Sequence, residues 1–322
     1  MNIPIPRRAA LLLPLAAPAV AQGMWPERPI NMIVPFAPGG TSEIVARTVA
    51  AELSKQLGQT VYVENKGGGA GIPAMQDVAK AAPDGHTLIL GHVGSLAVNP
   101  YIFPNQPFDV NRDFMPVTML AKVPNLFVIH PDVPAKNYKE FVAYTKANPG
   151  KLNYGTAGNA SAGHLAMEYL KLVEGMFITH IPYRGAGPAL NDTVSGQVPI
   201  IFDNVPSALP YIKDNRLVAI AVAAPQRLAV LPNVPTFKEL GLEPVNRMAY
   251  YGILGPKGLP QEVVDKVNAA TLKALQDPAV RKRIEDTGSI IIGNTPAQFA
   301  RQMADELGVY KKVVEQQKLK LD

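Results

Sequence analysis

The chain contains no cysteine. Disulfides, a thiol nucleophile and thiolate metal ligands are therefore excluded. This absence does not identify the cellular compartment, because an exported protein need not contain disulfides. The five histidines show no metal-ligand spacing between any two of them, so we expect no metal centre.

Clusters of one charge are also missing. The 31 basic and 26 acidic residues leave a formal net charge of +5, and no group of basic residues interleaves with aromatic side chains. Nucleic acid is therefore not an expected partner. What is present is an ordinary globular composition, with 47% hydrophobic and 18% charged residues. The length of 322 residues suggests about two domains.

The apolar run near the N-terminus is too short to span a membrane, which takes about 20 apolar residues. Residues 1–21 instead fit a signal peptide. Arg7 and Arg8 supply the charged start, residues 9–17 are apolar, and residues 19–21 (AVA) match the small-x-small cleavage pattern. We therefore predict export to the periplasm, with an N-terminal anchor as the alternative. The paired arginines leave Sec and Tat export open.

Two stretches of the chain repeat the same order of elements. Residues 73–77 (PAMQD) return as residues 188–192 (PALND). Upstream of each copy lie an apolar run, a loop of Gly, Ser and Thr, and an amphipathic helix, at 30–34, 35–42 and 43–57 and again at 152–154, 155–163 and 164–173. Short apolar runs that alternate with helices predict a parallel sheet covered on both faces. Two copies of one α/β lobe are expected to close around a small molecule.

The two loops have the chemistry of an anion site without fixed cations. In an open parallel sheet, ligands bind beyond the carboxyl ends of the strands, where the following helices present free N–H groups. The positive ends of the helix dipoles then favour an anion between the lobes. Neither residues 35–42 nor residues 155–163 contain Lys or Arg. Amides, hydroxyls and water would hold the anion, which suits a carboxylate better than a polyphosphate.

Two catalytic interpretations of the second loop fail on its residues. Residues 158–164 have P-loop glycine spacing, but His164 replaces the phosphate-binding Lys and Leu165 the Mg-binding hydroxyl. Residues 159–163 approach a nucleophile elbow, but Asn159 stands where its first Gly should be. We therefore predict a protein that is not an enzyme and needs no cofactor. An exported hydrolase that uses Ser161 is the weaker alternative.

Four polar residues beside the loops have two interpretations each. His164, at the start of the second helix, either caps that helix or forms a pocket wall. Asp203 follows the apolar run 199–202 at the expected cleft edge. If Asp203 touches the ligand, it favours an amine, a hydroxyl or a ring N–H. Lys66 and Arg184 occupy matching places after the second strand of each lobe. We interpret both as solvated charges at the rim of the cleft, with direct binding of the ligand as the alternative.

An ordered set of fragments resembles the substrate-binding receptors of tripartite tricarboxylate transporters, the Bug family. It includes residues 34–40 (VPFAPGG), 63–66 (VENK), 82–88 (APDGHTL), 113–117 (DFMPV), 182–185 (PYRG) and 231–236 (LPNVPT). The set covers essentially the whole chain after the signal peptide. Departures are Glu43 where Asp is common, a missing Pro after Lys66, and Tyr250-Tyr251 where Trp is frequent. The identity of the ligand is therefore not carried over.

The resemblance implies an α/β fold of the two-lobed periplasmic binding protein type, type II-like. Each lobe would be a mostly parallel sheet flanked by helices, with hinge strands between the lobes. We expect a monomer in which residues 22–122 plus 225–322 form lobe 1 and residues 123–224 form lobe 2. The ligand carboxylate would be held by the two lobe loops, partly through bridging waters. Carried over by motif, the expected ligand-binding residues are Phe36, Gly39, Gly40, Thr41, Ser42, His92, Val93, Thr156, Ala157, Gly158, Ser161, His164 and Asp203.

The implied function is that of a periplasmic solute receptor. It would bind a small carboxylate-bearing metabolite in the interlobe cleft and deliver it to the membrane permease subunits. A ligand-loaded sensor that docks on a membrane signalling partner has the same fold and is the main alternative.

Overall fold

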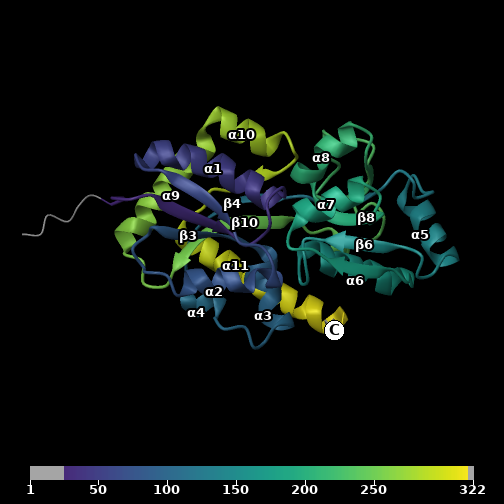
Figure 1. The fold of residues 1–322 in the computed structure, drawn as a ribbon, viewed down its shortest axis with the longest axis horizontal. Coiled ribbons are helices and arrows are strands. Elements are labelled where there is room, and N and C mark those ends of the chain that lie inside the picture. The colour runs from purple at the N-terminus through teal and green to yellow at the C-terminus, as the bar shows by residue number, and fades with distance from the viewer. Residues whose placement is uncertain (1–24, 318–322) are drawn as a thin grey trace, which may run out of the picture.

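The structure is a computed structural model that describes residues 25–317, so the predicted signal peptide lies outside the described residues. Figure 1 shows two groups of helices and strands side by side, with α1, α2 and α9 in one and α5, α6 and α8 in the other. Each group surrounds its own sheet. Among residues 25–317, no helix combines the length and the apolar character that a membrane crossing needs.

The first lobe is built on a six-stranded sheet with the order β11-β4-β10-β3-β1-β2. Its chain enters twice, before and after the second lobe. The elements of the first passage are β1 (Ile30–Val34), α1 (Thr41–Leu57), β2 (Val61–Asn65), η1 (Gly69–Gly71), α2 (Ile72–Ala79), β3 (Thr87–His92), η2 (Gly94–Val98), α3 (Asn99–Ile102), α4 (Val110–Asp113) and β4 (Phe114–Val123). The elements of the second passage are β10 (Ala249–Pro256), α9 (Gln261–Gln276), α10 (Pro278–Glu285), β11 (Ile290–Ile291) and α11 (Pro296–Gln317).

The second lobe is built on a five-stranded sheet with the order β7-β6-β8-β5-β9. Its elements are β5 (Asn125–Ile129), α5 (Tyr138–Ala147), β6 (Asn153–Thr156), α6 (Ala162–Glu174), β7 (Thr179–Pro182), α7 (Ala186–Val194), β8 (Ile200–Asn204), α8 (Val205–Lys213), β9 (Val218–Ala223) and η3 (Glu243–Val245).

The predicted duplication is confirmed by the topology of both sheets. The unit β1-α1-β2-α2-β3 gives the strand order β2-β1-β3, and the unit β6-α6-β7-α7-β8 gives the matching order β7-β6-β8. These strands pair in parallel. In the first sheet β10 is antiparallel to both β3 and β4, so β4 runs in the same direction as β3. In the second sheet β5 is antiparallel to both β8 and β9, so β9 runs in the same direction as β8. Four strands in each sheet therefore run the same way, as a mostly parallel sheet requires.

Each sheet is covered by apolar side chains on both faces. Met32 and Val34 of β1 pack on one face with the α1 stripe of Val45, Val49 and Leu53, where helical spacing places them together. Side chains alternate along a strand, so Ile33 points to the opposite face and packs in a separate cluster with Phe299 of α11. The near-continuous apolar runs of both lobes follow from this burial on two faces.

The chain passes between the lobes twice. Pro124 alone separates β4 from β5, and residues 224–248 lead from β9 back to β10. Within that second passage Phe237, Leu242 and Val245 pack in the core of the second lobe. The predicted division assigns residues 225–248 to lobe 1. We propose, from these core contacts, to place the boundary after η3 instead.

Helix α11 joins the lobes on one side of the molecule. It starts on the first sheet, where Phe299 is fully buried, and its Tyr310 and Val314 share a cluster with Ala162 and Leu165 of α6. Figure 1 shows α11 running across the first lobe toward α6. The C-terminal helix therefore contacts both halves of the molecule.

Candidate ligand-binding cleft

A small cavity lies between the lobes, at the carboxyl ends of β1, β3, β6 and β8. This is the edge at which an open parallel sheet binds ligands. The first lobe contributes Phe36, Gly40, Thr41, Ser42, His92 and Tyr251, and the second contributes Asn125, Ala157, Ser161, Ala162, Gly163, Ala186, Phe202, Asp203 and Asn204.

Eight of the thirteen predicted binding residues line this cavity. They are Phe36, Gly40, Thr41, Ser42, His92, Ala157, Ser161 and Asp203. The other five lie outside its lining. Gly39 is exposed and donates its amide to Glu43, while Val93 is fully buried in the core of the first lobe. Thr156 ends β6, Gly158 lies in the loop that follows and His164 lies in the first turn of α6, where Thr156 and His164 bond to that loop. Ligand contact remains a prediction for all thirteen.

Two helix N-termini from different lobes meet the cleft. Helix α1 follows Gly40, which has no side chain to cap it. The amides of Glu43 and Ile44 donate to Gly40 O at 3.1 and 3.2 Å, so the preceding amides of Thr41 and Ser42 remain for a ligand. In α6, Ser161 Oγ accepts from the His164 amide at 3.3 Å, and the amides of Ala162 and Gly163 remain in the same way. Together, the two dipoles favour an anion.

Two stacked histidines support the second loop from behind. The ring of His164 stacks on that of His180 with centroids 4.1 Å apart. His164 Nδ1 accepts from the Ala160 amide at 3.2 Å, and His180 Nε2 lies 2.8 Å from Thr156 Oγ1. Burial lowers the pKa of His164 to about 4 and that of His180 to about 3. Both rings are therefore neutral and hold the loop, which favours the structural interpretation of His164.

His92 supplies a neutral donor from the first lobe. Its Nδ1 accepts from the Gly94 amide at 3.0 Å, so the ring proton lies on Nε2. Burial lowers the pKa of His92 to about 3. The ring stands edge-on to Phe36 at 5.4 Å and tilts against Tyr251 at 5.0 Å. These aromatic rings fix the imidazole and give the cleft an apolar wall.

The lobes touch each other around the cavity, so the cleft is closed. The Ala37 amide donates to Arg184 O at 2.8 Å. The hydroxyls of Thr41 and Ser207 lie 2.8 Å apart, and the Ser207 amide donates to Thr41 Oγ1 at 3.2 Å. These hydrogen bonds join the first lobe to the loop between β7 and α7 and to α8 of the second lobe.

The cavity lining contains no Lys or Arg. Arg184 is exposed outside it, and Lys66 pairs with Asp77 at 3.1 Å. An anion in the cleft would therefore be held by amides, hydroxyls and the His92 ring. Asp203 is the single acidic residue of the lining, and burial raises the pKa of its carboxyl to about 6.

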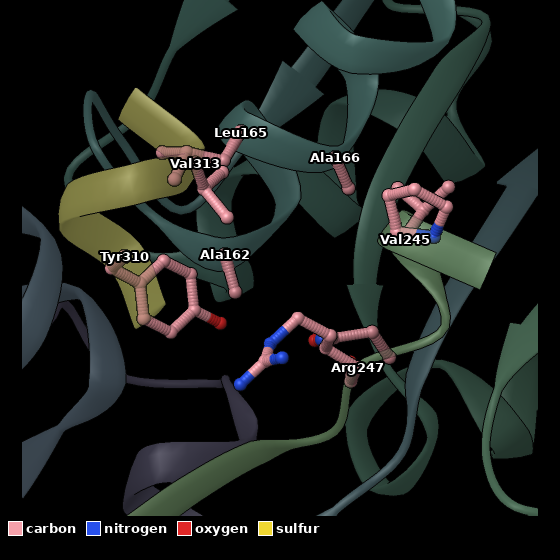
Figure 2. A pocket seen from close by; sticks show the side chains of 9 residues that line it. Ala162, Leu165, Ala166, Val245, Arg247, Tyr310 and Val313 are labelled. Carbon is pink, nitrogen blue, oxygen red and sulfur yellow. The ribbon is translucent and has the colours of Figure 1, made fainter. Parts of the chain in front are cut away.

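A second small hollow lies behind the cleft, at the two passages between the lobes. Figure 2 shows Arg247 and Tyr310 facing each other, with Ala162 and Leu165 of α6 and Val313 of α11 around them. Arg247 Nη2 lies 3.0 Å from Glu306 of α11, and Arg247 O accepts from Asn125 Nδ2 at 2.7 Å. Asn125 and Ala162 line both cavities. The cleft and the second hollow are therefore neighbours.

Ser161 does not have the partners of a catalytic nucleophile. Its Oγ accepts from the His164 amide, while the His164 ring bonds to the Ala160 amide. A serine nucleophile needs a base that accepts its proton, and no described side chain does so for Ser161. Within residues 25–317 no group of three His, Cys, Asp or Glu could hold a metal ion.

The sequence prediction missed seven lining residues. They are Asn125, Ala162, Gly163, Ala186, Phe202, Asn204 and Tyr251. Three of them, Ala162, Gly163 and Ala186, are the first residues of α6 and α7. The Gly-rich loops that precede these helices are the sequence signal that could have identified them. Asn125 and Tyr251 come from strands that cross between or return to the lobes. No local motif marks Asn125, and Tyr251 stands out only as a departure from the family pattern.

Two α/β lobes that close on a cavity faced by helix N-termini define a two-lobed periplasmic binding protein. The structure of the periplasmic binding protein BugD has a TM-score of 0.89 against this chain, with 32% identity, and covers 92% of this chain and 99% of its own. MatC from Rhodopseudomonas palustris, solved with bound malate, has a TM-score of 0.86 and 36% identity, with coverage of 90% and 100%.

The sequence comparison specifies the family. Residues 45–319 match the tripartite tricarboxylate transporter family receptor, and the chain belongs to this family. It is also 35% identical to protein BugT of Bordetella pertussis over 308 residues, which is 95% of this chain and 94% of BugT. The family is a class of solute receptors and not of enzymes. The predicted resemblance and the non-enzymatic interpretation are therefore confirmed.

Proposed function

We propose that this receptor binds a small carboxylate in the interlobe cleft and delivers it to a tripartite membrane permease. The observation that carries the proposal is the meeting of two helix N-termini, those of α1 and α6, in a cavity whose lining has no Lys or Arg. Backbone amides in this arrangement favour a single carboxylate group. The malate bound to MatC, a 36% identical protein, agrees with this ligand class.

The cellular setting forms part of the same proposal. Residues 1–21 direct the chain to the periplasm as a cleaved signal peptide, and the mature protein acts as a monomer. A receptor that closes on its ligand presents both lobes to the permease in one fixed arrangement, which lets the permease distinguish loaded from empty receptor.

Isothermal titration calorimetry against a panel of carboxylates tests the proposal. Mature protein, residues 22–322, is titrated with mono- and dicarboxylates, including an aromatic acid and amino acids. Saturable binding of one class of carboxylate is expected. A folded protein that binds none of them would contradict the proposal. Uptake of the best ligand by cells with and without the receptor then tests delivery, because a receptor for transport is required for uptake at low ligand concentration.

A further inference from the structure

The cleft carries one acidic group in a site that is otherwise built for an anion. Asp203 is the penultimate residue of β8, its side chain lines the cavity, and the residue is 7% exposed. A buried carboxylate is costly unless it is paired or hydrogen-bonded. It would also repel the ligand carboxylate that we propose for the cleft. The described residues give Asp203 hydrogen bonds but no cation that compensates its charge.

The surroundings of Asp203 leave part of its hydrogen-bonding capacity free. Ser207 Oγ donates to Asp203 Oδ2 at 2.6 Å, the backbone amide of Asn204 also donates to this carboxylate, and no other described side chain does so. No charged group among the described residues contributes to the pKa of Asp203, so no cation compensates it. An ionised carboxylate offers about four acceptor positions. The remaining positions face the cavity, where a donor on a bound ligand can fill them.

The single side-chain donor to Asp203 contacts the opposite lobe. Ser207 Oγ lies 2.8 Å from Thr41 Oγ1, and Thr41 is the first residue of α1. The two hydroxyls and the carboxylate therefore form one hydrogen-bonded chain across the closed cleft. Ser207 is a positioning residue in this chain, because its hydroxyl bonds to Asp203 and, when the lobes have met, to Thr41 of the opposite lobe.

We propose that Asp203 binds a hydrogen-bond donor on the ligand, so that the receptor selects carboxylates that also carry a hydroxyl or an ammonium group. This inference rests on the proposed function, in which the amides of α1 and α6 hold the carboxylate end. The ligand donor then faces Asp203 on the β8 side of the cavity. A matched acid that lacks the donor leaves Asp203 buried without its partner, which is the situation that gives polar sites their selectivity.

The test compares acids that differ only in the donor. Calorimetry at pH 7.5 uses the pairs L-malate and succinate, 3-hydroxybutyrate and butyrate, and L-glutamate and glutarate. In at least one pair, the donor-bearing acid is expected to bind on the order of 10- to 100-fold more tightly, the ratio expected for a hydrogen bond to a buried charged group. In Asp203→Leu, which has no acceptor, this ratio is expected to fall to within about 3-fold.

Two further variants separate the subsite from general damage. Ser207→Ala should reduce the donor selectivity ratio while the donor-free acid keeps its affinity. Asp132→Asn removes the same charge from an exposed side chain of the second lobe, and it should leave every ratio unchanged.

The outcomes of the test are distinct. If no acid binds, the proposed function fails. If the acids bind without a donor preference, the function stands and the Asp203 subsite fails. A donor preference that persists in Asp203→Leu would also overturn the subsite, because another group must then supply it. Loss of the preference in Asp203→Leu but not in Asp132→Asn supports the subsite.

Discussion

Gly187 is the position at which one added methyl group would keep the lobes apart. It is the second residue of α7, in the second lobe. A Cβ at Gly187 would lie 2.0 Å from Pro38 O and 2.9 Å from Gly39 Cα, both in the first lobe. The backbone of Gly187 is not in the left-handed region. Alanine therefore suits the helix, where it is favoured over glycine by about 1 kcal/mol. We predict that Gly187→Ala folds but does not close.

The size of the effect follows from the contacts around Gly187. A Cβ at 2.0 Å from Pro38 O must move outward by more than 1 Å to reach ordinary contact, which begins near 3.4 Å. The hydrogen bonds Ala37 N to Arg184 O and Thr41 Oγ1 to Ser207 Oγ, each 2.8 Å long, then exceed hydrogen-bonding distance. Each contributes about 0.5–1.5 kcal/mol net. Losing both lowers the ligand affinity roughly 5- to 150-fold.

Calorimetry and small-angle scattering measure the two parts of this prediction. The dissociation constant of the best carboxylate should rise in Gly187→Ala, and the ligand-induced decrease in the radius of gyration should disappear. Gly308→Ala is the matched control, because Gly308 lies in α11 and a Cβ there meets nothing within 4 Å. If Gly187→Ala keeps both the wild-type affinity and the wild-type compaction, closure through this contact is not part of binding.

Three further changes test the cleft and its supports. His92 is neutral in the folded protein, where its pKa is about 3, compared with 6.5 in the unfolded chain. Below pH 6.5 the unfolded chain therefore binds more protons than the folded protein, and the free energy of unfolding falls as the pH falls. At pH 4.5 this histidine alone should cost about 3 kcal/mol, and an unchanged melting temperature between pH 7.5 and pH 4.5 would argue against the buried neutral ring. Tyr251→Phe removes a buried hydroxyl that donates to Asn204 Oδ1 at 2.8 Å, and denaturant unfolding should show a loss of roughly 1–2 kcal/mol, whereas an unchanged midpoint would contradict that hydrogen bond. Ser161→Ala removes the N-cap of α6 and should cost about 1 kcal/mol of stability. If the wild-type protein hydrolysed esters and Ser161→Ala did not, the protein would be a hydrolase and not a receptor without catalysis.

Local sequence signals were sufficient for the duplicated α/β unit. The strand Ile30–Val34 agrees with the prediction at both ends, because it is apolar throughout and Pro35 stops it. The predicted helix at 43–57 begins two residues earlier, at Thr41. Gly40 has no side chain to mark the start, so the loop and the helix could not be separated from residue types alone.

The parts of the cleft that depend on chain crossings could not be predicted in the same way. Helix α8, which carries Ser207, was not among the predicted elements, and its Pro206 and Pro210 are residues that disfavour a helix. Pro206 is tolerated near the helix start, and Pro210 interrupts only a short helix. Tyr251 was recognised as a departure from the family pattern, yet its bond to Asn204 joins β10 to β8. Such a contact exists only after both lobes are assembled.

Native mass spectrometry of receptor purified without denaturation tests the central claim most directly. The account predicts a protein peak with one added small molecule, and the released molecule should be a carboxylate that carries a hydroxyl or an amine. Gly187→Ala, purified in parallel, should retain much less of it. A released ligand without a carboxylate group, or equal retention by both proteins, would contradict the account.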